Sequence, residues 1–324
     1  MSSVFRNQFT KLMLRDLYAW AFESYDAVEA VYPKIFRVEN SSGSFEQKTS
    51  GIGMGMLSER KEGADILESN PLEGYTVYGK NRTFSDSYSL TAEFVEDTPT
   101  EKIANIMSDL ARSWGDGVIR SKETFGAKFL NYGGYTAGHD VFNNTITGVV
   151  TDPTGDLCYD GKPFFNLSGN TRSSKNGGTY YNGLALSLSS TNLQTAYNLM
   201  TNTNNRNERD EIVSLMPNVL VIPPALRFTA KTILESEAIV GSANNDINAT
   251  QNMLTPIEWH YLSDSDAWFI GTAGKGLVWQ ERKPFVIDFY QNEVNKKYYA
   301  TIDARWGARM ENWRYWVGSN FSTS

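Results

Sequence analysis

The sequence is poor in the residues that metal centres and acid–base catalysts use most. Its 324 residues include two histidines, His139 and His260, and a single cysteine, Cys158. One cysteine cannot form a disulfide within the chain, and it cannot build a cysteine-based zinc cluster. Two histidines leave few arrangements for histidine-based catalysis.

The chain also lacks long basic stretches and long apolar stretches. No cluster of Lys and Arg is longer than a pair, and the formal charge is −7. Proteins that coat nucleic acid carry a basic stripe, so direct DNA binding is disfavoured. No window approaches the length of apolar sequence that spans a membrane. The first residues lack the features of a secretory signal, so we expect a soluble, cytosolic chain.

The histidines and the cysteine suggest one weak catalytic arrangement. His139 and Asp140 follow a glycine-rich turn, and Cys158 could act beside them as a nucleophile. The spacing does not support that pairing, and a buried cysteine with a loop histidine explains the same residues. His260 lies between two aromatic residues on an expected strand, which favours a structural role.

Two segments carry fragments of ligand-binding motifs. Asp152, Asp156 and Asp160 recur every fourth residue, whereas an EF-hand calcium loop needs ligands at alternate positions and a closing glutamate. Gly271–Gly276 contains a lysine but lacks the Ser or Thr that follows the lysine of a phosphate-binding loop. We interpret them as a solvated acidic loop and a turn between strands. The sequence therefore predicts no enzyme, no metal site and no cofactor.

The first 97 residues are predicted to form elements that cannot enclose a core by themselves. A helix from about Phe5 to Phe22 has one apolar face, made of Phe5, Phe9, Met13, Leu17 and Ala21. A two-stranded ribbon follows, with strands around Phe45–Leu57 and Tyr75–Val95. Because an isolated ribbon is only marginally stable, we expect both elements to pack on a neighbouring copy.

The ribbon has an alternating pattern of apolar and polar residues. In its second strand the apolar residues lie at even-numbered positions, as in a half-buried strand. They are Phe84, Tyr88, Leu90, Ala92 and Phe94. In its first strand Ile52, Met54 and Met56 alternate with glycines, which allow close approach of another chain. The tip, Ser58–Gly74, is charged and includes Lys61 and Glu62.

A long helix is predicted after the ribbon. Thr98 is expected as its N-cap and Pro99 at its first helical position, with a glutamate three residues after the cap. Apolar residues recur every three or four positions to about Leu130, which corresponds to a helix of roughly 45 Å. Gly115 and Gly117 weaken its middle, so we expect a bend there.

The rest of the chain mixes loops, helices and strands. Asn131–Ser189 is rich in Gly, Asn, Asp and Ser, which is typical of loops. A helix is expected from Ser190, a buried strand over Asn218–Ile222 and a helix over Ala225–Ser236. Further strands are expected at Ile257–Leu262, Ala267–Ile270, Phe285–Tyr290, Lys297–Ala308 and Trp313–Val317. Together these elements predict an α+β fold.

This order of elements resembles the major capsid protein fold of tailed bacteriophages, first defined for phage HK97. Short blocks are similar to those of the Mu-like major head subunits, and they extend over most of Lys102–Val317. The blocks are Tyr159–Phe165, Leu193–Met200, Asn218–Leu226, Ala230–Ser236, Asp266–Phe269, Ala304–Ala308 and Asn312–Arg314. Asn312 stands where that group is expected to have an acidic residue.

The resemblance implies an order of domains along the chain. It predicts an N-terminal arm over 1–36, an extended E-loop over 37–97, a P-domain spine helix over 98–130, an A-domain with P-domain segments over 131–276, and P-domain strands with the C-terminus over 277–324.

The resemblance also implies a function. It predicts a major capsid protein whose copies form the pentamers and hexamers of an icosahedral shell around phage double-stranded DNA, without sequence-specific binding. It implies location in the virion after assembly in the host cytoplasm, with separate scaffold, portal and decoration proteins as partners. Candidate residues for contacts between subunits are Phe5, Phe9, Met13, Ile52, Met54, Met56, Lys61, Glu62, Phe84, Tyr88, Leu90 and Phe94.

Two other functions remain open at this stage. An encapsulin-like nanocompartment shell would share the fold and would need a groove that docks cargo. A β-rich phage tail or surface protein would use its Tyr- and Trp-rich strands to bind a ligand. A hydrolase that uses the residues around Cys158 is the least favoured of the functions considered.

Overall fold

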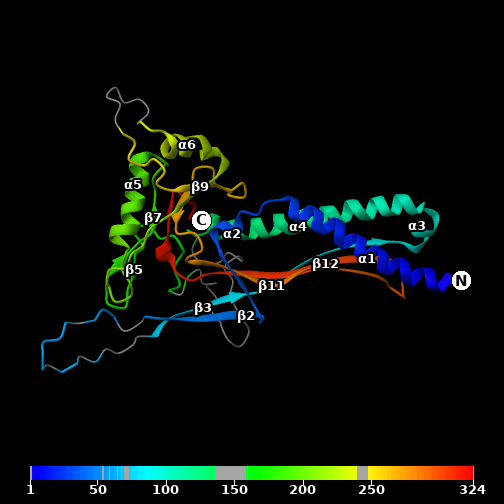
Figure 1. Cartoon of the computed structure of the whole chain (residues 1–324), viewed down its shortest axis with the longest axis horizontal. Helices are drawn as coiled ribbons and strands as arrows, with labels where there is room; N and C mark the ends of the chain where they lie inside the picture. Colours follow the sequence, from blue (N-terminus) through cyan, green and yellow to red (C-terminus); the bar gives the residue numbers. More distant parts are fainter. Residues whose placement is uncertain are drawn as a thin grey trace.

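The computed structural model describes residues 2–52, 55–57, 59–63, 65–66, 68, 73–135, 158, 160–238 and 247–323. Figure 1 shows an elongated part, in which two long helices run along a sheet, and a second part with shorter helices around another sheet. A two-stranded hairpin projects from the molecule. This combination of helices and separate sheets confirms the predicted α+β fold class.

The two long helices pack against each other. α1 (Ser2–Ala27) lies on α4 (Thr100–Asn131), as Figure 1 shows. Met13, Leu17 and Ala21 are buried on α1, because a spacing of four residues places them on one face. The predicted amphipathic helix and the predicted long helix are both confirmed in these residues.

The start of the long helix differs from the prediction. Thr98 does not cap α4; it follows a short helix, α3 (Ala92–Asp97), and its backbone N–H donates to the carbonyl of Phe94. The hydroxyl of Thr91 caps α3 by accepting a hydrogen bond from the backbone nitrogen of Phe94. The end of the predicted second ribbon strand therefore belongs to α3. Thr98, the predicted N-cap of α4, is instead the C-cap of α3.

Gly115 lies at a close contact between α1 and α4. A Cβ atom at this position would overlap the backbone oxygen of Ala21, and it would lie 3.0 Å from the Cβ atom of Ser24. At Gly117 a Cβ atom would meet nothing within 4 Å outside its own helix. Gly115 therefore allows the two helices to touch. Helix propensity, by which Gly115 only weakens α4, does not predict this packing role.

A four-stranded sheet runs beside the long helices. β11 (Leu277–Gln291) and β12 (Tyr298–Met310) form a long antiparallel pair at its centre. β1 (Arg37–Asn40), which follows the short helix α2 (Tyr32–Ile35), pairs with β11 in parallel. β4 (Arg82–Leu90) pairs antiparallel with β12. Aromatic rings fill the core against α4, and they include Phe125, Phe129, Trp279 and Trp306.

The predicted ribbon is shorter than expected. β2 (Phe45–Gly51) pairs with β3 (Glu73–Lys80), but the chain then turns and β4 joins the long sheet. Buried Asn81 holds this turn, because its side-chain nitrogen donates to Ser41 and to the carbonyl of Gly43. The alternation that begins at Phe84 therefore belongs to the long sheet, where the rings of Phe84 and Trp306 stack with centroids 4.0 Å apart.

The second part of the molecule is built on a five-stranded sheet. Its strands, in spatial order, are β7 (Gly183–Leu184), β13 (Trp316–Ser319), β10 (Trp268–Gly271), β8 (Val219–Ile222) and β9 (Thr255–Glu258). α5 (Ser190–Asn198) and α6 (Arg227–Glu235) pack on it and enclose a second core. β8 and α6 confirm the predicted strand and helix, and residues 272–276 form the predicted turn between β10 and β11.

Shorter elements complete the description. They are β5 (Arg172–Ser173), β6 (Thr179–Tyr180), the π-helical turn η2 (Leu199–Thr203), and the 3₁₀ turns η3 (Pro224–Leu226) and η4 (Trp313–Tyr315). The C-terminal strand β13 lies in the five-stranded sheet, while β11 and β12 lie in the long sheet. The predicted segment 277–324 is therefore divided between the two parts.

A buried carboxylate joins several parts of the fold. Glu123 on α4 is 3% exposed. It accepts hydrogen bonds from the backbone nitrogens of residues 31–32, at 2.6 and 3.1 Å, and from the indole nitrogen of Trp259 just after β9. Since a buried charge is costly without partners, these bonds hold the start of α2 and the end of β9 against α4.

We expect Gly115→Ala to lower the free energy of unfolding by about 1–3 kcal/mol, because the added methyl group forces α1 away from α4. Gly117→Ala is the matched control on the same helix. It should raise that free energy by about 0.5–1 kcal/mol through helix propensity alone. Urea unfolding of the purified subunit, followed by circular dichroism, measures both values. Equal effects of the two substitutions would contradict the close helix contact at Gly115.

Candidate functional site

The hairpin of β2 and β3 projects from the rest of the subunit (Figure 1). Thr49 lies opposite Thr76, and their hydroxyl oxygens are 2.9 Å apart. Beyond this pair the register shifts, and the chain continues into a tip that projects from the rest of the subunit (Figure 1). We take the tip from here on as residues 57–68; in its described part, Leu57 is 100% exposed and Ile66 is 77% exposed. These two exposed apolar side chains make the projecting tip a candidate for contact with another molecule.

A cluster of charges anchors the base of the hairpin. Glu311, directly after β12, lies 3.0 Å from Lys48 on β2, 2.8 Å from Arg37 on β1 and 2.7 Å from Arg309 on β12. Burial alone raises the pKa of the Glu311 carboxyl, but the hydrogen bonds from Arg309 and Lys48 outweigh it and hold that pKa below its ordinary value. One ionised carboxylate therefore connects the hairpin to the long sheet.

A second contact holds the hairpin closer to its tip. The backbone nitrogen of Met56 donates to Glu211, at 2.8 Å, and a Cβ atom on Gly55 would lie 2.9 Å from the same carboxylate oxygen. Asn207 donates to the other oxygen of Glu211. The hydrogen bonds from Asn207 and then Met56 lower the pKa of Glu211. The hairpin is therefore tied to its own subunit at two points, whereas the sequence suggested packing on a neighbour.

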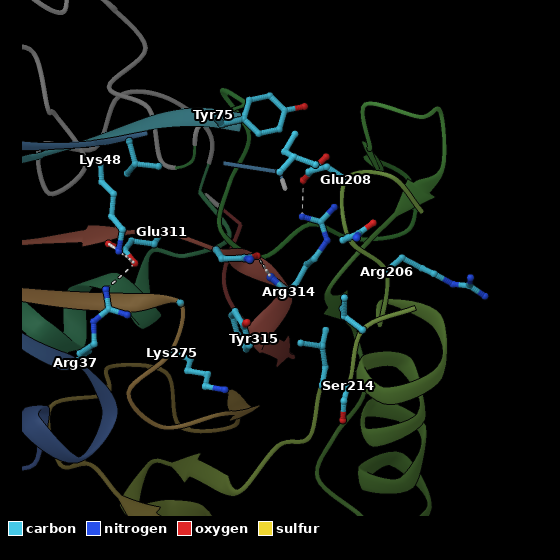
Figure 2. Close-up of a pocket in the computed structure, with 17 residues that line it drawn as sticks. Arg37, Lys48, Tyr75, Arg206, Glu208, Ser214, Lys275, Glu311, Arg314 and Tyr315 are labelled. Carbon is cyan, nitrogen blue, oxygen red and sulfur yellow. Dashed lines mark hydrogen bonds and ion pairs between the residues drawn. The ribbon is translucent and has the colours of Figure 1, made fainter. Parts of the chain in front are cut away.

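A pocket of about 500 Å³ lies between the hairpin base and the five-stranded sheet (Figure 2), a volume typical of ligand sites. We call it the base pocket. Its charged lining residues are Arg37, Lys48, Arg206, Lys275, Arg314, Glu208 and Glu311. Arg314 pairs with Glu208 at 2.6 Å and lies over the ring of Trp313. The lining has five cationic residues and two carboxylates, and although Figure 2 shows the Arg206 side chain extending away from the others, the excess of cations favours an anion.

The candidate contact residues fall into three groups. Met13, Phe84 and Leu90 pack within their own subunit, because α1 and β4 belong to the main core. Met56, Lys61, Glu62, Tyr88 and Phe94 are exposed, and Ile52 lines the base pocket. Phe5 and Phe9 lie on α1, but their side chains, like residue Met54, lie outside the described residues. The five exposed residues stay predicted contacts.

The candidate catalytic residues are not brought together in the described structure. His139 and Asp140 lie outside the described residues. Burial raises the pKa of the Cys158 thiol to about 11, which disfavours the reactive thiolate. His260 is 71% exposed and lies in a turn, because β9 ends at Glu258. The expected strand position of His260 was therefore wrong.

The acidic segment before β5 also differs from its interpretation. Asp160 pairs with the guanidinium of Arg172 at 2.9 Å, and Arg172 is 1% exposed. Asp160 is thus a structural partner of a buried cation, while Asp152 and Asp156 lie outside the described residues. Within the described residues there is no group of three or more metal-ligating side chains, and no helix long and apolar enough to cross a membrane.

The chain is similar to a known protein family and to several solved structures. Residues 75–318 match the family described as phage capsid protein. A chain from Mycobacterium phage Patience is 10% identical with a TM-score of 0.57, over 97% of this chain and 88% of that one. No curated protein matches the sequence.

Two further solved structures have the same fold. A chain of the bacteriophage PhiM1 mature capsid is 10% identical with a TM-score of 0.54, over 92% of this chain and 88% of that one. A chain from the capsid of a native GTA particle is 12% identical with a TM-score of 0.52, over 91% and 92%. At such low identity the likeness concerns the fold, and it confirms the HK97-like capsid fold that the element order predicted.

We expect Glu311→Gln to release the base of the hairpin. Hydrogen exchange of the β2 amides at neutral pH should rise at least tenfold, since a hydrogen bond to a charged group contributes roughly 1.5–3 kcal/mol. Because the folded-state pKa of Glu311 is lowered, its contribution to stability is present at neutral pH and lost as the pH falls through that pKa. The wild type should therefore lose β2 protection on acidification, after correction for the intrinsic exchange rate.

Glu293→Gln, at an exposed residue between β11 and β12, is the matched control and should leave β2 exchange unchanged. If Glu311→Gln left exchange unchanged as well, the anchoring role of Glu311 would be wrong.

Proposed function

The chain belongs to the phage capsid protein family, and from this premise we propose that its copies form the pentamers and hexamers of an icosahedral head that encloses phage double-stranded DNA. The family is a structural one, and it favours this function over a nanocompartment shell or a tail protein. Shell assembly needs surfaces that bind other copies of the same chain, so the argument turns on those surfaces.

The hairpin carries the proposal. Glu311 anchors its base and Glu211 holds the chain near its tip, while Leu57 in the tip is fully exposed. Burial of apolar surface contributes roughly 25 cal/mol of favourable free energy per Å², so burying Leu57 against another subunit would stabilise the contact. An anchored base also limits the conformational entropy lost on binding.

A second set of exposed residues lies at the far end of the long sheet and helices. Tyr88 on β4 and Phe94 on α3 are 39% and 37% exposed. Figure 1 shows α3 at the end of the molecule opposite α5 and α6, and the hairpin tip also extends away from α3. Two separate contact regions would let one subunit touch different neighbours, which the closing of a shell requires.

The domain assignment is part of the proposal, with two changes that the sheets support. We assign the E-loop to residues 45–80, because β4 belongs to the long sheet with the spine helix α4. We assign β13 to the A-domain with β8 and β10. The arm over 1–36 keeps its predicted bounds.

Partners beyond the chain itself follow from the same function. We propose separate scaffold, portal and decoration proteins, location in the virion, and assembly in the host cytoplasm. Contact with DNA would be independent of sequence, in keeping with a formal charge of −7 and basic clusters no longer than a pair. The Mu-like relationship rests on short blocks such as Tyr159–Phe165, and it is the finer part of this proposal.

We expect the expressed protein to form closed shells or capsomers in negative-stain electron microscopy and size-exclusion chromatography. Leu57→Asp should reduce the yield of shells at least tenfold, because it places a charge in a contact that buries an apolar side chain. Circular dichroism should show that this variant remains folded.

Phe228→Asp is the matched control, since Phe228 is 78% exposed on α6, outside both proposed contact regions. A wild-type protein that stayed monomeric would contradict the proposed function. Normal assembly of Leu57→Asp would contradict only the role of the tip.

A further inference from the structure

The base pocket contains two cations that differ from the rest of its charged lining. Arg37, Lys48 and Arg314 each pair with a carboxylate. Lys275 instead lies over the ring of Tyr315, with its amine 5.5 Å from the centroid, and Arg206 donates to a backbone carbonyl. Among the described residues, no carboxylate lies within ion-pair distance of either group.

The walls around these cations come from different elements. Figure 2 shows Tyr75 of the hairpin on one side of the pocket, with Lys275 and Tyr315 on the opposite side. Apolar residues complete the lining, among them Ile52 and Val77 of the hairpin and Leu215 before β8. A pocket with a cationic excess and apolar walls suits a peptide that carries both carboxylates and apolar side chains.

The hairpin tip has this chemistry. Residues 59–68 contain four acidic and two basic side chains, so the tip is acidic. Glu59, Glu62, Asp65 and Glu68 are exposed; exposed Leu57 precedes them and exposed Ile66 lies among them. The bond from the backbone nitrogen of Met56 to Glu211 fixes the chain just before the tip to its own subunit, and from there the tip extends away from the base of the hairpin, as Figure 1 shows.

We propose that the base pocket of one subunit binds the acidic hairpin tip of a second copy, with Lys275 as the cation that receives one of its carboxylates. The proposal rests on the proposed function and adds the partner segment and its binding site. Each subunit then offers a tip and a pocket at different places on its surface. Such a head-to-tail contact joins copies into rings when the rotation between them closes.

A synthetic peptide of residues 57–68, labelled with a fluorophore, tests the pocket directly by fluorescence anisotropy with the full-length subunit. We expect Lys275→Glu to weaken binding at least tenfold, and higher salt to weaken wild-type binding, because exposed charge pairs are screened. The backbone carbonyl of Lys275, which accepts a bond from Trp316, is not altered by this substitution.

Two matched controls accompany this measurement. Lys102→Glu makes the same change of charge on an exposed residue of α4, and it should leave binding unchanged. A peptide in which the four acidic residues become Gln or Asn should bind wild type at least tenfold more weakly. Lack of peptide binding to wild type, or equal binding to Lys275→Glu, would overturn the proposal.

A charge exchange tests the contact in assembly. Lys275→Glu should reduce shell yield at least fivefold, and the addition of Glu62→Lys should restore at least half of the loss, because tip and pocket then exchange signs. Failure of the double variant to restore assembly would count against the pocket. Shell formation by the wild type is measured separately, so the proposed function and this inference can fail independently.

Discussion

The buried charges on α4 are the constraint on which the rest of the structure depends. Glu123 binds the start of α2 and the indole of Trp259, and its neighbour Lys122 pairs with Glu281 of β11 at 2.8 Å. Both side chains are almost fully buried, so each would be costly without its partners. One helical turn thereby connects the arm, the long sheet and the five-stranded sheet.

The contacts of Glu123 also fix the position from which the hairpin starts. β1 follows α2 directly and pairs with β11, and Arg37 on β1 reaches the same Glu311 that binds Lys48. The base of the hairpin is therefore positioned by the connector that Glu123 holds. Its tip stays exposed, with apolar and acidic side chains together. Under the proposed function, a hairpin anchored in this way would need little ordering when it binds a neighbouring subunit.

Local patterns predicted several elements correctly, and their failures have local causes. Met13, Leu17 and Ala21 identified the packed face of α1, and the strand and helix of β8 and α6 were evident from their apolar residues. The alternating pattern that begins at Phe84 correctly predicted a strand, but alternation does not show which other strand it pairs with. The candidate contact residues divided into buried and exposed sets for that reason. The base pocket had no signal in the sequence because six separate segments line it.

The sequence by itself determined the fold class, the capsid likeness and the place of the hairpin, since helix periodicity, strand alternation and element order are local properties of the chain. The tertiary structure alone decided which strand pairs with β12, why Gly115 is a glycine, and that Lys122 and Glu123 are buried. In the sequence those two charged residues look like part of an exposed helix face. They can be buried only because the folded chain brings them partners that are distant in the sequence. These partners are residues 31–32 and Trp259 for Glu123, and Glu281 for Lys122.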